Sequence, residues 1–110
     1  MTKWAIIKTQ FEANHYWEGA MAEVSFLKNS HRHKFFVELW IEQEHNERDV
    51  EYITEKEKLD IFLTKFAKQV LPHSCETFAE MIKQDWERRR YPRRVKVGVW
   101  EDNENGAFLE

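Results

Sequence analysis

Three histidines in the sequence have the type and spacing that suit a metal site. His31 and His33 are separated by one residue in a strand-like run, and residues two apart on an extended backbone project to the same face. His15 ends an earlier strand-like run, so a neighbouring strand can bring a third imidazole to the pair. Three nitrogen ligands leave one coordination position open, as in a catalytic rather than a structural zinc site. The three histidines therefore predict a Lewis-acid metal that faces a substrate.

The alternative is that these histidines are half-buried polar residues, because a His-x-His pair alone is weak evidence of a metal. His45 and His73 have no partner at ligand spacing, so we expect them on the surface or in loops.

Alternating apolar and polar residues predict the strands that carry the three histidines. One strand is expected from Trp4 to Tyr16 and a second from about Arg32 to Glu42. His15 and His33 each share a face with the apolar residues of their strand, which places them at the end of the core. The connection between these strands contains a possible short strand at Glu23–Phe26.

The hydrophobic period changes to three and four after Thr54, which predicts an amphipathic helix that ends at Pro72. Ser74 is the expected N-cap of a second helix, whose buried stripe extends to Trp86. Cys75 falls in the first turn of that helix on its apolar side. A packing thiol is favoured there over a nucleophile, although a helix N-terminus lowers the pKa of a thiol.

Two further strands are expected at Arg94–Trp100 and Ala107–Leu109, joined by a polar turn in which Asn105-Gly106 is a hairpin signal. The predicted order is ββααββ. We therefore expect a single α+β domain over residues 1–110, with a four-stranded antiparallel sheet and two helices on one face.

Composition narrows the classes of partner. The net charge of −3 does not favour nucleic acid or an anionic membrane. The basic cluster Arg88–Arg90, with Arg93 and Arg94, is expected to complement a helix C-terminus, and phosphate contact is the alternative.

A single cysteine excludes an intramolecular disulfide, and no segment is long and apolar enough for a membrane span, so a cytoplasmic protein is expected.

Four segments in this order resemble the 6-pyruvoyl-tetrahydropterin synthase / 6-carboxy-tetrahydropterin synthase family of tunnelling-fold (T-fold) proteins. They are Phe11–His15, His31–His33, Ser74–Glu76 and Val97–Glu101, and they span nearly the whole chain. The predicted ββααββ order matches the fold of this family.

The resemblance implies that His15, His31 and His33 bind Zn²⁺, and that Glu101 and Glu76 hold the guanidine-like edge of a pterin. A carboxylate suits that edge because it accepts two parallel charge-assisted hydrogen bonds. Without the resemblance, Glu101 is a strand-end surface carboxylate and Glu76 a first-turn acid favoured by the helix dipole. The family also implies a homo-oligomer, a trimer or hexamer whose sheets join into a barrel with sites at subunit interfaces. The high aromatic fraction of 15% independently suggests apolar surface buried against another subunit.

The sequence departs from the family in its catalytic residues. The usual cysteine before the histidine pair is absent from residues 25–28, and the usual Leu-Asp-His-His segment is missing, because Leu59-Asp60 falls inside the first helix. Arg32 stands where the family has a glycine between the two histidines. The catalytic residues are therefore unknown, with His73 and Glu23 as weak candidates for the base.

Two main hypotheses follow. The first is a zinc-dependent lyase of the 6-carboxy-tetrahydropterin synthase type, acting on dihydroneopterin triphosphate. The second is a non-catalytic T-fold protein that binds or sequesters a pterin or purine-nucleotide-like ligand. The missing cysteine favours the second, and the retained histidines favour the first. A third reading is a structural interaction domain with coincidental histidines.

Overall fold

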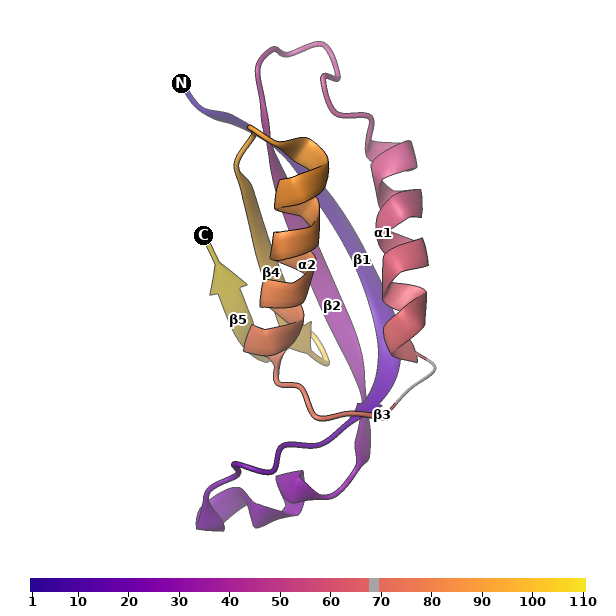
Figure 1. The fold of residues 1–110 in the computed structure, drawn as a ribbon, viewed down its shortest axis with the longest axis vertical. Coiled ribbons are helices and arrows are strands. Elements are labelled where there is room, and N and C mark those ends of the chain that lie inside the picture. The colour runs from indigo at the N-terminus through magenta and orange to yellow at the C-terminus, as the bar shows by residue number, and fades with distance from the viewer. Residues whose placement is uncertain (68–69) are drawn as a thin grey trace.

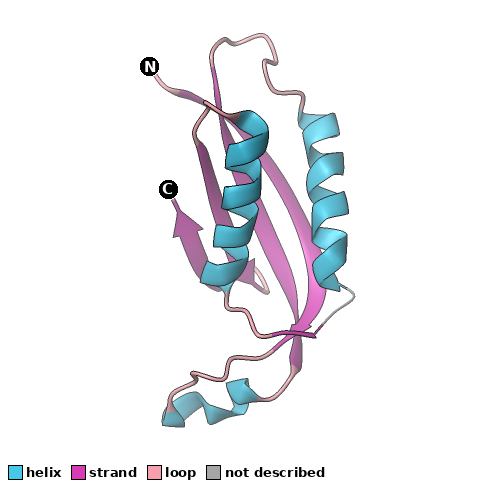
Figure 2. Ribbon diagram, viewed as in Figure 1, coloured by secondary structure: helices cyan, strands magenta, loops and turns pink. Residues whose placement is uncertain are grey.

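An antiparallel sheet covered on one face by two helices forms the body of the chain (Figures 1 and 2). This computed structural model describes residues 1–67 and 70–110. The sheet contains β1 (Lys3–His15), β2 (His31–Gln43), β3 (Val70–Leu71), β4 (Val95–Glu101) and β5 (Asn105–Leu109) in the order β3-β1-β2-β4-β5. The helices are α1 (Tyr52–Ala67) and α2 (Cys75–Arg90), and a 3₁₀ segment, η1 (Ala22–Lys28), lies in the β1–β2 connection.

The predicted α+β class and ββααββ order are confirmed. The four long strands pair antiparallel, whereas the two-residue β3 pairs in parallel with the end of β1. The expected helix after Thr54 is confirmed as α1, and Leu59-Asp60 lies inside it. Its predicted end at Pro72 is wrong, because α1 ends at Ala67 and Val70–Leu71 form β3. Residues 68 and 69 lie outside the described part of the chain.

The predicted short strand at Glu23–Phe26 is also wrong. These residues belong to η1, none of whose residues is buried. Phe26, the last residue of the expected strand, is 65% exposed. The segment projects away from the sheet (Figure 1), so no neighbouring strand is available to pair with it and stabilise an extended conformation.

The core lies between the sheet and the helices. Alternate residues of the three central strands are buried on the helix-covered face: Ala5, Ile7, Phe11, Ala13, Phe35, Val37, Leu39, Ile41, Val95, Val97 and Val99. The helices bury Leu59, Leu63, Phe66, Phe78, Ala79, Ile82 and Trp86 against them. Burying a large apolar side chain contributes about 1.5–3 kcal/mol, so this single layer supplies most of the driving force for folding. A residue at an odd position of β1 or β2 is therefore directed into the core.

Helix α2 begins where the sequence predicts. The Ser74 hydroxyl accepts a hydrogen bond from the Thr77 N–H at 3.3 Å, which confirms Ser74 as the N-cap. Arg88, Arg89 and Arg90 occupy the last turn, as expected for cations at a helix C-terminus. All three are paired with carboxylates of the chain rather than left open to a phosphate.

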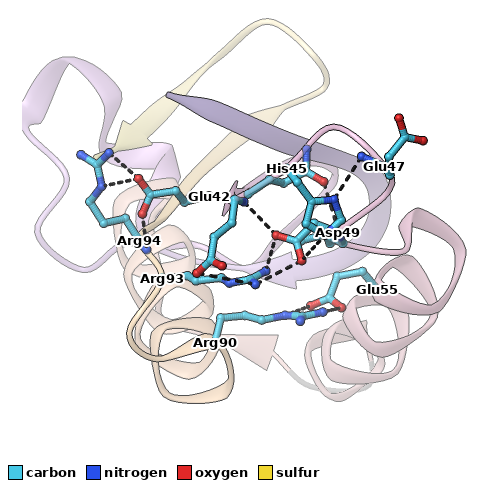
Figure 3. A network of polar contacts seen from close by, with 11 residues as sticks. Glu42, His45, Glu47, Asp49, Glu55, Arg90, Arg93 and Arg94 are labelled. Carbon is cyan, nitrogen blue, oxygen red and sulfur yellow. Dashed lines mark hydrogen bonds and ion pairs between the residues drawn. The ribbon is translucent and has the colours of Figure 1, made fainter. Parts of the chain in front are cut away.

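A buried ion pair joins the two helices (Figure 3). Glu55 of α1 is 1% exposed, and its carboxylate accepts hydrogen bonds from Trp86 Nε1 at 2.8 Å and from Arg90 of α2. Burial alone raises the pKa of Glu55, but the hydrogen bonds from Arg90 and Trp86 outweigh it and hold this pKa below its ordinary value. At the same end of the molecule, Arg93 and Arg94, which precede β4, pair with Asp49 of the β2–α1 loop and with Glu42 of β2, respectively.

We predict that Glu55→Gln lowers the free energy of unfolding at pH 7 by about 3 kcal/mol, because the substitution breaks a buried pair and leaves the guanidinium of Arg90 uncompensated. Because the folded-state pKa of Glu55 is depressed, its contribution is present above the unfolded-state pKa and is lost as the pH falls through the folded-state value. Urea titrations from pH 7 down to pH 3 should therefore bring the two proteins closer in stability. Glu57→Gln, an exposed change on the same helix, is the control, and an equal loss in both variants would contradict this account.

The β4–β5 hairpin is confirmed, but its turn precedes the Asn-Gly pair. Asn105 and Gly106 already lie in β5, opposite Glu101 and Trp100. Asp102 and Asn103 form the turn with φ of 50° and 59°, a left-handed conformation that these two residue types tolerate. At position 106 a Cβ would overlap the backbone of β4, so glycine is needed there for close approach rather than for the turn.

Neither helix of the described residues has the length and apolar character required to cross a lipid bilayer.

Candidate metal centre

The pairing of β1 with β2 brings the three predicted histidines together. His15 lies directly opposite His31, and His33 lies opposite Ala13, two residues earlier in β1. The imidazole centroids are 4.4 Å apart for His15–His31, 5.3 Å for His15–His33 and 4.9 Å for His31–His33. One ring nitrogen of each residue lies within 4.8 Å of the other two. The three histidines thus form a group that could hold a metal ion.

Each of the three imidazoles is oriented by an oxygen acceptor at its Nδ1 atom. The pairs are His15 with the His73 carbonyl at 2.7 Å, His31 with the Asn29 carbonyl at 2.7 Å, and His33 with Asp102 Oδ2 at 2.6 Å. A ring nitrogen facing an acceptor carries the proton and donates it, so each neutral ring has its lone pair on Nε2. Metal-binding histidines in proteins are oriented by second-shell contacts of this kind.

The Nε2 atoms of His15 and His31 are buried and have no hydrogen-bond partner in the described part of the chain. An unsatisfied buried acceptor is costly, and such groups point to an unseen partner such as an ion. Burial, assisted by the neighbouring imidazoles of His31 and His33, lowers the pKa of His15 and outweighs the opposing hydrogen bond to His73. His15 is therefore neutral at physiological pH, which is the form that binds metal.

The donor set defines a class of metal. Three imidazole nitrogens suit zinc and also copper, iron or nickel, whereas calcium and magnesium prefer oxygen ligands. The residues present therefore fit a transition-metal ion with a coordination position left open.

A cavity of about 480 Å³ lies next to Glu101, and none of the three histidines is among the residues that line it in the described part of the chain. It is lined by Trp17, Leu27, Ser74, Cys75, Glu76, Glu101, Asn105 and Gly106. Both carboxylates that the resemblance implies for ligand binding, Glu101 and Glu76, thus line one cavity. Glu101 also borders the histidines, with Oε1 3.6 Å from His15 Nε2 and Oε2 3.8 Å from His33 Nε2. Glu101 therefore connects the group of three histidines with the cavity.

Cys75 lines the same cavity but is poorly suited to act as a nucleophile. Its side chain is buried, and burial together with the negative charges of Glu101 and Glu76 raises the pKa of the thiol to about 12. The thiol is therefore protonated at neutral pH, which agrees with the expected packing role.

Neither weak candidate for the base, Glu23 or His73, is among the residues that line the cavity within the described chain. Glu23 is exposed on η1. The His73 ring packs edge-on against Phe78, with centroids 5.6 Å apart, and its backbone carbonyl orients His15. His45 is exposed and pairs with Asp49, as expected of a surface residue.

Arg32 points to the opposite face of the sheet from the two histidines that flank it. It pairs with Asn14, an outward position of β1, and its guanidinium lies 3.8 Å from Glu12. The side chain is 71% exposed, so arginine at this position does not crowd the three histidines.

Three groups that orient the imidazoles were not found from the sequence. Two are the backbone carbonyls of Asn29 and His73, and carbonyl positions have no signature in side-chain types. The third is the carboxylate of Asp102, whose pKa the hydrogen bond with His33 lowers, as does the Lys34 N–H. Its position directly after Glu101 in a predicted turn is the one signal that could have drawn attention to it.

No protein-family model matches the chain, and no curated protein is significantly similar to it.

We predict that the protein binds one divalent transition-metal ion per chain. His31→Ala should abolish this stoichiometric binding, because the two remaining imidazoles are too few to hold the ion against water. Metal content after dialysis, measured by inductively coupled plasma mass spectrometry, tests this. His45→Ala removes a surface histidine and should leave the metal content unchanged. A metal content that His31→Ala does not alter would contradict the assignment.

Proposed function

We propose that the chain is a zinc-binding T-fold protein that processes a pterin, resembling 6-carboxy-tetrahydropterin synthase. The observation that carries the proposal is the convergence of three histidines, with two orphaned Nε2 atoms, beside a cavity lined by Glu101. A three-histidine site with an open coordination position, joined to a cavity of ligand size by a shared carboxylate, suits a catalytic or ligand-binding centre rather than a structural one.

In this proposal His15, His31 and His33 hold Zn²⁺. Zinc bound there supplies a Lewis acid that polarises a carbonyl or hydroxyl oxygen of the ligand and acidifies a neighbouring proton. The acceptors at Nδ1 fix the orientation of the three rings and leave Nε2 as the nitrogen that faces the metal, so the site needs little rearrangement to bind it.

Glu101 and Glu76 hold the ligand in the same proposal. The side chain of Glu101 is 34% exposed, so its carboxylate is available to the cavity while one edge remains against the histidines. A carboxylate complements the paired N–H donors of a pterin or guanine ring through two parallel hydrogen bonds. The cavity volume of about 480 Å³ falls within the usual range for small-molecule sites.

The enzymatic form of the proposal is a lyase acting on dihydroneopterin triphosphate, with a general base still to be identified. The second candidate is a non-catalytic protein that sequesters a pterin or a purine-nucleotide-like ligand. One observation favours this second candidate: the cavity's thiol, Cys75, has a raised pKa and is protonated at neutral pH. The ligand is a small molecule rather than nucleic acid or a membrane, and the single cysteine suits the reducing cytoplasm.

We predict that Glu101→Gln weakens binding of a pterin or guanine-like compound about thirtyfold, because an amide presents a donor where two acceptors are required. Isothermal titration with pterin and guanine ligands measures the effect. Metal content should be unchanged, since Glu101 is not a proposed zinc ligand. Glu104→Gln alters an exposed carboxylate on the same hairpin and should bind like the parent protein. Equal affinity in the Glu101 variant would remove the proposed anchor.

Turnover separates the two candidates. If the chain is a lyase, the parent protein converts dihydroneopterin triphosphate and the His31→Ala variant does not. Chromatography of the products measures this conversion. Tight binding of an intact ligand without turnover would select the sequestering protein.

The proposal includes assembly into a homo-oligomer, a trimer or a hexamer. The outer edge of β5 is unpaired among the described strands, and β1 is paired on its outer side over Asn14 and His15 alone. The sheet face opposite the helices carries an aromatic row across four strands. The ring centroid of Trp40 lies 6.4 Å from that of Trp4 and 5.5 Å from that of Phe108, and the centroids of Trp100 and Phe108 are 6.5 Å apart. Open edges and a large apolar face are features that proteins cover by association.

We predict a homo-oligomer by light scattering coupled to size-exclusion chromatography, at concentrations from micromolar upward. The open edge of β5 and the aromatic face supply both backbone pairing and apolar burial for the association. Phe108→Glu places a charge on the exposed face at the edge strand and should shift the population towards monomer. A parent protein that stays monomeric over this whole range would contradict the assembly.

A further inference from the structure

The β4–β5 turn is attached to β2 at the metal-binding histidines. Asp102 Oδ2 lies 2.6 Å from His33 Nδ1, and Asp102 Oδ1 accepts a hydrogen bond from the Lys34 N–H at 3.1 Å. The Asp102 N–H donates in return to the Lys34 carbonyl at 2.7 Å. Both carboxylate oxygens and the backbone N–H of one turn residue are therefore engaged by two consecutive residues of β2.

The backbone of Asp102 has a conformation that most residue types avoid. Its φ is 50°, in the left-handed region where a side chain costs free energy unless glycine, asparagine or aspartate occupies the position. Asn103, the next residue, has a φ of 59° and makes no side-chain hydrogen bond in the described part of the chain. The turn therefore has two neighbouring left-handed positions. The side chain at the first, Asp102, reaches His33, whereas the side chain at the second, Asn103, does not.

We propose that Asp102 is a positioning residue of the metal centre, which forms an Asp102–His33–metal relay and sets the strength with which His33 binds the ion. The inference rests on the metal site of the proposed function and extends it to a residue outside the set of direct ligands. The imidazoles of His15 and His31 donate to neutral carbonyl groups. Among the three proposed ligands, His33 is therefore the one whose ring is oriented by a carboxylate.

A carboxylate acceptor at Nδ1 has two effects on a histidine ligand. It fixes the ring orientation and the tautomer with the lone pair on Nε2, and its negative charge raises the basicity of that nitrogen. The charge also matters for the site as a whole, because three neutral imidazoles supply no negative charge to a divalent ion, and Asp102 adds a second carboxylate to Glu101, which borders His15 and His33. Asp102 lies on the same hairpin as Glu101, Asn105 and Gly106, which line the cavity, so this turn contacts both the metal site and the ligand site.

The test compares glycine substitutions at the two left-handed positions. Asp102→Gly removes the carboxylate and preserves the turn, since glycine adopts this φ readily, and Asn103→Gly makes the same backbone change while keeping the carboxylate. Co²⁺ affinity is measured by competition with a chromophoric chelator, Zn²⁺ affinity by displacement of Co²⁺, and the visible d–d spectrum is recorded at saturating Co²⁺.

We expect Asp102→Gly to weaken binding of both ions by about 10–100-fold and to alter the Co²⁺ spectrum, whereas Asn103→Gly stays close to the parent protein. Asp102→Asn is measured in parallel in case the glycine variant fails to fold. The amide places an NH₂ group, which cannot accept, at one of the two oxygen positions that face His33 and Lys34, and it has no negative charge, so it should also lose affinity.

Each outcome is decisive. Parent-like affinity and spectrum in a folded Asp102→Gly or Asp102→Asn variant would overturn the relay, as would an equal loss in Asn103→Gly. A parent protein that binds neither ion would instead overturn the metal site itself, and with it the proposed function.

Discussion

The register between β1 and β2 is the constraint on which the candidate site depends. It places His15 directly opposite His31 and brings His33 to the same face. Because side chains alternate along a strand, a slip of one residue would turn one set of histidines towards the opposite face and expose the apolar residues of the same strand. The packing of Ile7, Phe11 and their partners against the helices therefore holds the three imidazoles together. The stability of the core and the geometry of the site have the same cause.

The second feature of the site is that the chain supplies an oxygen for every Nδ1 atom. Two of these oxygens are the carbonyls of Asn29 and His73, which lie shortly before the starts of β2 and α2. The third belongs to Asp102 in the β4–β5 turn. Segments far apart in the sequence thus converge on one small group of rings. Such an arrangement leaves the Nε2 atoms as the free acceptors, directed to one place beside the carboxylate of Glu101. A metal ion there would satisfy two buried nitrogen atoms and lie close to Glu101, which lines the cavity.

The sequence predicts the parts of this arrangement that depend on local patterns. Strict alternation identifies the two histidine strands and hence the shared face of His15 and His33, and the Ser74 cap marks the start of α2. The segment at Glu23–Phe26 belongs to a 3₁₀ helix rather than to the expected strand, because four residues are too few for periodicity to distinguish the two. The orienting oxygens could not be predicted, since they depend on where loops end in space. The resemblance was needed to single out Glu101 and Glu76 from the other acidic residues.

The central claim is that three imidazoles and one exchangeable ligand hold zinc in this chain. X-ray absorption of the zinc-loaded protein at the metal edge tests it most directly. The account predicts three imidazole nitrogens and one oxygen in the first coordination sphere, at about 2.0–2.1 Å, with the outer-shell pattern typical of histidine rings. A sulfur ligand at about 2.3 Å would indicate that Cys75 binds the metal and would contradict the account. Fewer than three imidazole ligands would contradict it equally.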